Sequence, residues 1–81
     1  MQDYDYFSTN DLALASALTT QGYSIEAIDR PLHSRRAAFL FARTNALTQV
    51  VDDYWSDQLQ VSPKAYFDAL KHLKTRLYAG V

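Results

Sequence analysis

The segment Ala37–Ala42 constrains the fold of this chain most strongly, because it has the pattern of a β-strand that is apolar on both faces. Side chains alternate between the two faces of a strand, so Phe39 and Phe41 point to one side and Leu40 to the other. A strand with one face in water would alternate apolar with polar residues. This strand therefore needs cover on both faces, and the chain has 81 residues with which to supply it.

Length and composition predict a single small domain over residues 1–81. The chain is 48% hydrophobic and has two glycines and two prolines, which argues against disorder. It has no cysteine, so disulfides and thiolate zinc sites are excluded, and we expect a cytoplasmic protein. The acidic N-terminus is not a signal peptide, and no apolar run approaches the roughly 20 residues of a membrane helix, so we expect no membrane contact.

Residue periodicity predicts an α+β fold in the order helix, β-hairpin, helix, helix (αββαα). Ser8 is expected to cap a first helix over about 9–21, which ends at Gly22. The hairpin strands are expected at 23–29 and about 36–43, joined by a long turn. Residues 1–7 precede these elements as an acidic, tyrosine-rich arm.

Two amphipathic helices are expected after the hairpin. Thr44 or Asn45 is expected to cap the second helix. Ser62 is expected to cap the third, with Pro63 in its first turn. Their apolar residues recur at helical spacing. The expected apolar faces are Leu47, Val50, Val51 and Tyr54 on the second helix, and Tyr66, Leu70, Leu73 and Leu77 on the third.

An isolated two-stranded hairpin is marginal in water, and an uncovered strand edge favours pairing with another chain. A homodimer through the hairpin is therefore one expectation. The alternative is that the third helix completes the core within one chain.

Four stretches of the chain are taken together here: Phe7–Ala15, Arg36–Phe41, Tyr54–Trp55, and the tail from Val61 through Phe67, Leu70, Leu73, Lys74 and Tyr78. In combination they resemble a family of short prokaryotic proteins that is classed only as a domain of unknown function. The resemblance extends over most of the chain and rests on core positions and caps, so it implies a fold more than a chemistry. It implies a small cytoplasmic protein and no assigned activity.

No residue constellation predicts catalysis, a metal or a cofactor, so we expect a protein that is not an enzyme. Asp68 and His72 lie four residues apart and would form half of a metal site, but no second pair accompanies them. His33 and Ser34 are adjacent only in sequence, and a turn does not hold the geometry of a nucleophile and its base.

The charged residues occur in blocks along the chain. Residues 1–29 contain acids but neither Lys nor Arg, residues 30–43 contain four arginines and no acid, and residues 44–60 contain three aspartates alone. Lysine and arginine return in residues 61–81. Such blocks either form a charged binding face or pair with one another in the fold.

The leading hypothesis is a non-enzymatic module that binds another protein as a regulator or inhibitor. Tyrosine, tryptophan and arginine are enriched in protein interfaces. Trp55, at the edge of the second helix's apolar stripe, is expected to pack in the core or, alternatively, to contribute to such an interface. The candidate contacts are Tyr4, Tyr6, Arg30, His33, Arg35, Arg36 and Trp55.

The alternative hypothesis is nucleic-acid binding through the hairpin tip and the last helix. Arg35, Arg36, Lys71 and Lys74 are the candidate phosphate contacts. Against this hypothesis, the isoelectric point of about 6.0 is far from the basic values typical of nucleic-acid-binding modules.

Overall fold

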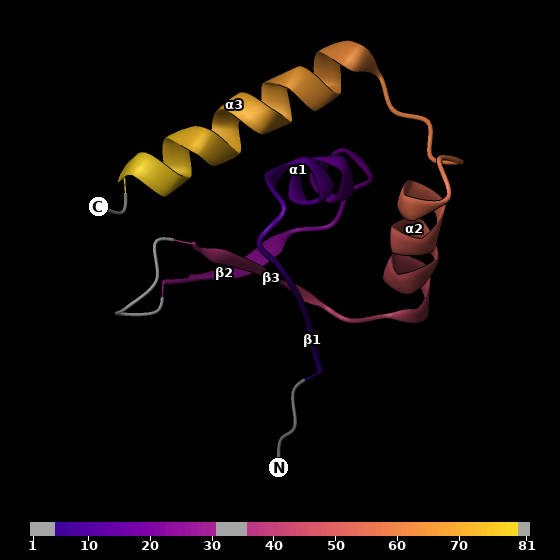
Figure 1. Cartoon of the computed structure of the whole chain (residues 1–81), viewed down its shortest axis with the longest axis horizontal. Helices are drawn as coiled ribbons and strands as arrows, with labels where there is room; N and C mark the ends of the chain where they lie inside the picture. Colours follow the sequence, from indigo (N-terminus) through magenta and orange to yellow (C-terminus); the bar gives the residue numbers. More distant parts are fainter. Residues whose placement is uncertain (1–4, 31–35, 80–81) are drawn as a thin grey trace.

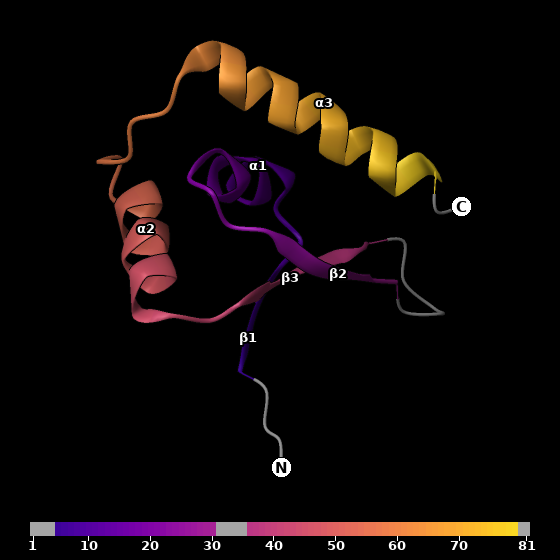
Figure 2. The same cartoon turned by 180° about the vertical axis from the view of Figure 1, so that it is seen from behind.

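The computed structural model describes residues 5–30 and 36–79, which form a three-stranded antiparallel sheet and three helices (Figure 1). This confirms the predicted α+β class. Helix α1 lies between the sheet and α3, and α2 lies beside them (Figures 1 and 2). The elements are β1 (Tyr6–Thr9), α1 (Leu12–Thr20), β2 (Ile25–Asp29), β3 (Ala38–Ala42), α2 (Asn45–Trp55) and α3 (Pro63–Ala79).

Strand β1 is an addition to the predicted element order. The strands lie in the order β1-β3-β2, and β1 pairs with β3 from Tyr6 opposite Ala42 to Thr9 opposite Phe39. Both edges of β3 are therefore paired within one chain. The last two residues of the expected N-terminal arm, Tyr6 and Phe7, belong to β1, and residues 1–4 lie outside the described residues.

The start of α1 differs from the prediction, because Asp11 and not Ser8 is the N-cap. The Asp11 side chain accepts hydrogen bonds from the backbone N–H groups of Ala13 at 2.9 Å and Leu14 at 3.3 Å. Ser8 lies in β1. An aspartate at the N-cap satisfies N–H groups that have no partner within the helix, and its negative charge suits the helix dipole.

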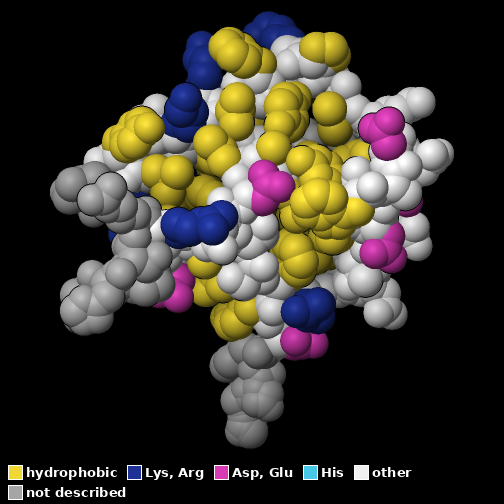
Figure 3. Space-filling view, in the orientation of Figure 1, with side chains coloured by type: hydrophobic (Ala, Val, Ile, Leu, Met, Phe, Trp, Pro, Cys, Tyr) yellow, Lys and Arg dark blue, Asp and Glu magenta, His cyan; other side chains and the backbone are white. Residues whose placement is uncertain are grey.

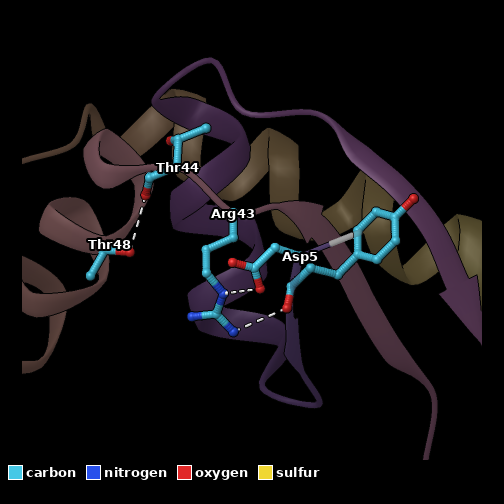
Figure 4. A network of polar contacts seen from close by, with 5 residues as sticks. Asp5, Arg43, Thr44 and Thr48 are labelled. Carbon is cyan, nitrogen blue, oxygen red and sulfur yellow. Dashed lines mark hydrogen bonds and ion pairs between the residues drawn. The ribbon is translucent and has the colours of Figure 1, made fainter. Parts of the chain in front are cut away.

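The junction between the sheet and α2 is held by polar contacts (Figure 4). Arg43 follows β3 and donates from Nε to the Asp5 carboxylate at 3.1 Å and from Nη2 to the Tyr6 carbonyl at 3.0 Å. The next residue, Thr44, caps α2 by accepting a hydrogen bond from the Leu47 N–H at 3.0 Å. The end of β3 is thus joined both to the start of β1 and to the first turn of α2.

The core lies between the sheet and the helices. Phe39 and Phe41 point toward the helices and are no more than 1% exposed. On the other face of β3, Leu40 is only half-buried, so the expected cover is complete on one face of the strand and partial on the other. The buried apolar cluster is Leu14, Ala15, Leu18, Phe39, Phe41, Leu47 and Leu73.

Helix α1 is the central element of the core. Five consecutive residues, Leu14–Leu18, are buried, so this helix has no solvent-exposed face in its middle. The single polar residue among them, Ser16, donates its hydroxyl hydrogen to the Leu12 carbonyl at 2.8 Å, which satisfies a group that would be costly to bury unpaired. The small side chains in this run allow α3 and the sheet to pack on opposite sides of α1.

Candidate functional site

A pocket of about 510 Å³ opens where the end of α2, the following linker and the first turn of α3 meet α1. This volume is within the range of about 300–1,000 Å³ that is typical of ligand sites. Figure 3 shows hydrophobic side chains gathered on the face of the molecule that extends from α3 across the space between α1 and α2. The pocket is lined by Ala17, Tyr54, Trp55, Asp57, Leu59, Val61 and Tyr66.

Two aromatic rings form one corner of this pocket. The ring centroids of Tyr54 and Trp55 are 4.9 Å apart, and the ring planes meet at 86°. Trp55 is 65% exposed, so the expectation that it packs in the core is wrong. The reason is its position at the last residue of α2, beyond the stripe formed by Leu47, Val50 and Val51 that faces α1.

The Tyr54 hydroxyl lies in an environment that disfavours its ionisation. Burial raises the pKa of Tyr54 above its ordinary value of 10.0, and the nearby Asp11 carboxylate and Tyr66 hydroxyl raise it further. These groups come from α2, the N-cap of α1 and α3, respectively. The three helices therefore bring polar and acidic groups to the same aromatic site.

Asp57 occupies an unusual backbone conformation at the pocket rim. Its φ of 64° lies in the left-handed region, where residues other than glycine, asparagine and aspartate are uncommon. Hydrogen bonds hold this turn: the Asp57 N–H donates to the Tyr54 carbonyl at 3.2 Å, and the Gln58 N–H donates to the Asp53 carbonyl at 2.8 Å. The Asp57 backbone is thus held just beyond the C-terminus of α2.

Sequence reasoning did not predict this pocket. Of its lining residues, only Trp55 was a candidate for binding, whereas Tyr54 and Tyr66 were assigned to apolar helix faces. The available signal was the short interval between the end of the second helix and the Ser62-Pro63 start of the third. A short linker limits how far apart the two helix ends, and the aromatic residues on them, can lie.

A second feature is basic. Arg30, just after β2, donates from Nη2 to the carbonyl of Arg76 on α3 at 3.2 Å. This contact places the hairpin end against the C-terminal half of α3, as both ribbon views show (Figures 1 and 2). The two basic segments predicted from the sequence are therefore neighbours. We use the name basic end for the exposed cations of these two segments, of which Arg30 and Arg76 are in contact. They are Arg30, Arg36, Lys71, Lys74 and Arg76.

The other predicted contact residues lie apart from the pocket or outside the described structure. Tyr4, His33 and Arg35 belong to the residues that the structure does not describe. Tyr6 is 42% exposed on β1. Lys71 is exposed on α3, with its Nζ 5.1 Å from the Phe67 ring centroid.

The charge blocks are partly separated in space. Figure 3 shows Lys and Arg side chains along α3 and toward the hairpin, and acidic side chains over α2. One ion pair joins two blocks, Arg43 with Asp5 at 3.1 Å, and another lies within one block, Lys64 with Asp68 at 3.0 Å. The described residues thus combine ion pairs with separated basic and acidic regions.

Within residues 5–30 and 36–79, no three His, Cys, Asp or Glu side chains gather as a metal site would require. In the same part of the chain, no helix combines the length and apolar character needed to cross a bilayer.

Comparison with known proteins gives a family but no function. No curated protein and no solved structure matches the chain. One family model matches residues 4–79, and its description is "Domain of unknown function (DUF5659)". This match includes every helix and strand that the structure describes, and it confirms the resemblance of the sequence to an uncharacterised family. The chain therefore belongs to the DUF5659 family.

Proposed function

We propose that this chain is a non-enzymatic module that binds another protein through the surface around the Trp55 pocket and thereby regulates or inhibits it. The observation that carries the proposal is the 65% exposure of Trp55, the single tryptophan of the chain, at the rim of a pocket with apolar walls. Exposed aromatic residues beside concave apolar surface are typical of interaction hot spots. A prokaryotic origin and a cytoplasmic location, expected from the resemblance and from the absence of cysteine, belong to the same proposal.

The test compares two exposed aromatic residues, of which only one lines the pocket. Trp55→Ala removes the pocket rim, whereas Tyr78→Ala removes a ring that is 70% exposed on α3 and does not line the pocket. Wild-type protein and the two variants are immobilised, and proteins captured from native lysate are quantified by mass spectrometry. We expect a protein that is retained by wild type and Tyr78→Ala and lost with Trp55→Ala. Equal retention by Trp55→Ala, or no capture above an unrelated protein of similar size, contradicts the proposal.

Self-association is part of the same proposal, but the strand edge available for it differs from the one that the sequence led us to expect. Both edges of β3 are paired within the chain, so the remaining open edges are those of β1 and β2. A second copy would add a strand at one of these outer edges. Light scattering at increasing protein concentration measures this directly, and a constant monomer mass contradicts it.

Nucleic-acid binding is the second candidate, and the Arg30–Arg76 contact favours it, because it brings the basic residues of the hairpin end next to the C-terminal half of α3. A mobility shift with DNA and RNA should weaken as salt increases. Replacing Lys71 and Lys74 together by alanine should make the salt dependence shallower. Lys64→Ala is the control, since Lys64 pairs with Asp68 at the other end of the same helix. Absence of any shift at low salt removes this candidate.

A further inference from the structure

The aromatic corner of the pocket is suited to a flat cation. The Tyr54 and Trp55 rings are nearly perpendicular to one another, and both residues line the pocket. Tyr66 adds a third ring from α3. The face of an aromatic ring attracts cations, most strongly for tryptophan, and arginine takes part in such contacts more often than lysine.

The charge around the pocket has the sign that a cation requires. Asp57 is the single charged residue among those that line the pocket. The chain segment 44–60, which supplies four of the lining residues, contains three aspartates and neither lysine nor arginine. Asp11 lies close enough to influence the Tyr54 hydroxyl. An anionic ligand would therefore meet repulsion here.

The position of Asp57 adds a second electrostatic reason. Carbonyl groups at a helix C-terminus carry partial negative charge, so acidic side chains are unfavourable there and cations are favourable. Asp57 lies two residues beyond the last residue of α2, with its backbone in the left-handed region. A bound cation would offset the repulsion between this carboxylate and the end of the helix.

We infer that the pocket binds the guanidinium group of an arginine side chain that a partner protein inserts between the Trp55 ring and the Asp57 carboxylate. Guanidinium is planar and stacks on aromatic faces, and its N–H groups donate two parallel hydrogen bonds to a carboxylate. A quaternary ammonium has no such donor and would leave Asp57 without a hydrogen bond. This inference rests on the proposed function and adds the chemistry of the group that the partner presents.

The test uses the peptide acetyl-Gly-Arg-Gly-amide as the probe and the fluorescence of Trp55 as the signal. Because Trp55 is the single tryptophan, any change in emission reports on the pocket. The same peptide with citrulline in place of arginine has almost the same shape without the charge. We expect arginine to bind about tenfold more tightly than citrulline, and more tightly than lysine or trimethyl-lysine.

Two variants locate the binding site. Asp57→Asn removes the charge and retains a residue that accepts the left-handed backbone, so the fold should persist. It should weaken arginine binding about tenfold, the loss expected for one charged hydrogen-bonding partner. Asp52→Asn is the matched control, because Asp52 is exposed on α2 and does not line the pocket. It should change the affinity less than about twofold, as expected for a screened surface charge.

The results separate this inference from the proposed function. Equal binding of citrulline and arginine, tighter binding of trimethyl-lysine, an equal effect of both asparagine variants, or no change in emission overturns the inference. If Trp55→Ala loses a protein partner while the arginine peptide does not bind, the proposed function is supported and the inference about guanidinium is contradicted. If the peptide binds as expected while Trp55→Ala retains every partner, guanidinium binding in the pocket is supported and the proposed function is contradicted.

Discussion

Leu73 and Phe67 lie on the same helix, and the structure predicts that truncating the smaller residue costs more stability. Leu73 is 1% exposed and belongs to the core cluster, whereas Phe67 is 56% exposed. Leu73→Ala removes three buried carbon atoms, worth about 2.4 kcal/mol at about 0.8 kcal/mol per buried CH₂ group. The remaining cavity adds to this cost, and the total should be about 3 kcal/mol.

Phe67→Ala should cost about 1 kcal/mol or less, because more than half of the side chain is already in water. Its contact with Lys71 is an exposed cation–π pair worth about 0.5 kcal/mol. Alanine has a high helix propensity at both positions, so the backbone contribution favours both variants. A domain of 81 residues has a free energy of unfolding of about 4–12 kcal/mol, so a loss of about 3 kcal/mol is readily measured.

Urea denaturation of both variants, followed by circular dichroism, gives the two free energies of unfolding. We expect a larger loss for Leu73→Ala and an unchanged dependence of that free energy on urea concentration. A loss for Phe67→Ala that equals or exceeds that for Leu73→Ala would refute the placement of α3 against α1.

Three further predictions concern single residues. Asp11→Ala should lower the free energy of unfolding in urea by about 1 kcal/mol, whereas Ser8→Ala should change it by less than about 0.5 kcal/mol. A larger loss for Ser8→Ala than for Asp11→Ala would show that Ser8 is the N-cap. Gly22→Ala should lower the free energy of unfolding by about 1 kcal/mol through backbone conformation alone. The reason is that φ is +94° and that no heavy atom beyond Gly22 and its two chain neighbours lies within 4 Å of the added Cβ. A variant that is more stable than wild type in thermal denaturation would contradict this backbone geometry. The raised pKa of Tyr54 means that the folded state holds the hydroxyl proton more tightly than the unfolded state, so the contribution of this proton to stability is complete below pH 10 and is lost as pH rises above that value. Tyr54→Phe should therefore show a smaller loss of stability above pH 10. An identical pH dependence in both proteins would disprove the raised pKa.

The helices after the hairpin were predictable because their signals are local. Leu47, Val50, Val51 and Tyr54 recur at helical spacing, and Thr44 supplies a cap at the right distance. The burial of Phe39 and Phe41 followed from the alternation of side chains along one strand. In each case the deciding residues lie within a few positions of one another.

The features that escaped prediction depend on contacts between distant segments. Strand β1 has four residues, and its partner is β3, so nothing close in sequence marks it as a strand. The run Ser8–Asp11 contains four residues that are able to cap a helix, and the pairing of β1 with β3 decides which of them does so.

The pocket has the same origin. Its walls come from α1, α2 and α3, and the exposure of Trp55 depends on where α2 ends relative to α3. Hydrophobic spacing identifies which residues face inward along a helix. It does not give the distance between the ends of two helices.

The pairing of β1 with β3 has a consequence for how the chain folds as it is synthesised. Strand β1 leaves the ribosome before its hydrogen-bonding partner β3, which follows only after α1 and β2 have emerged. Bringing such distant segments together carries a larger loop-closure entropy than forming the β2–β3 hairpin. Strand β1 should therefore join the sheet after the β2–β3 hairpin has formed, and until then the nascent chain exposes one edge of β3.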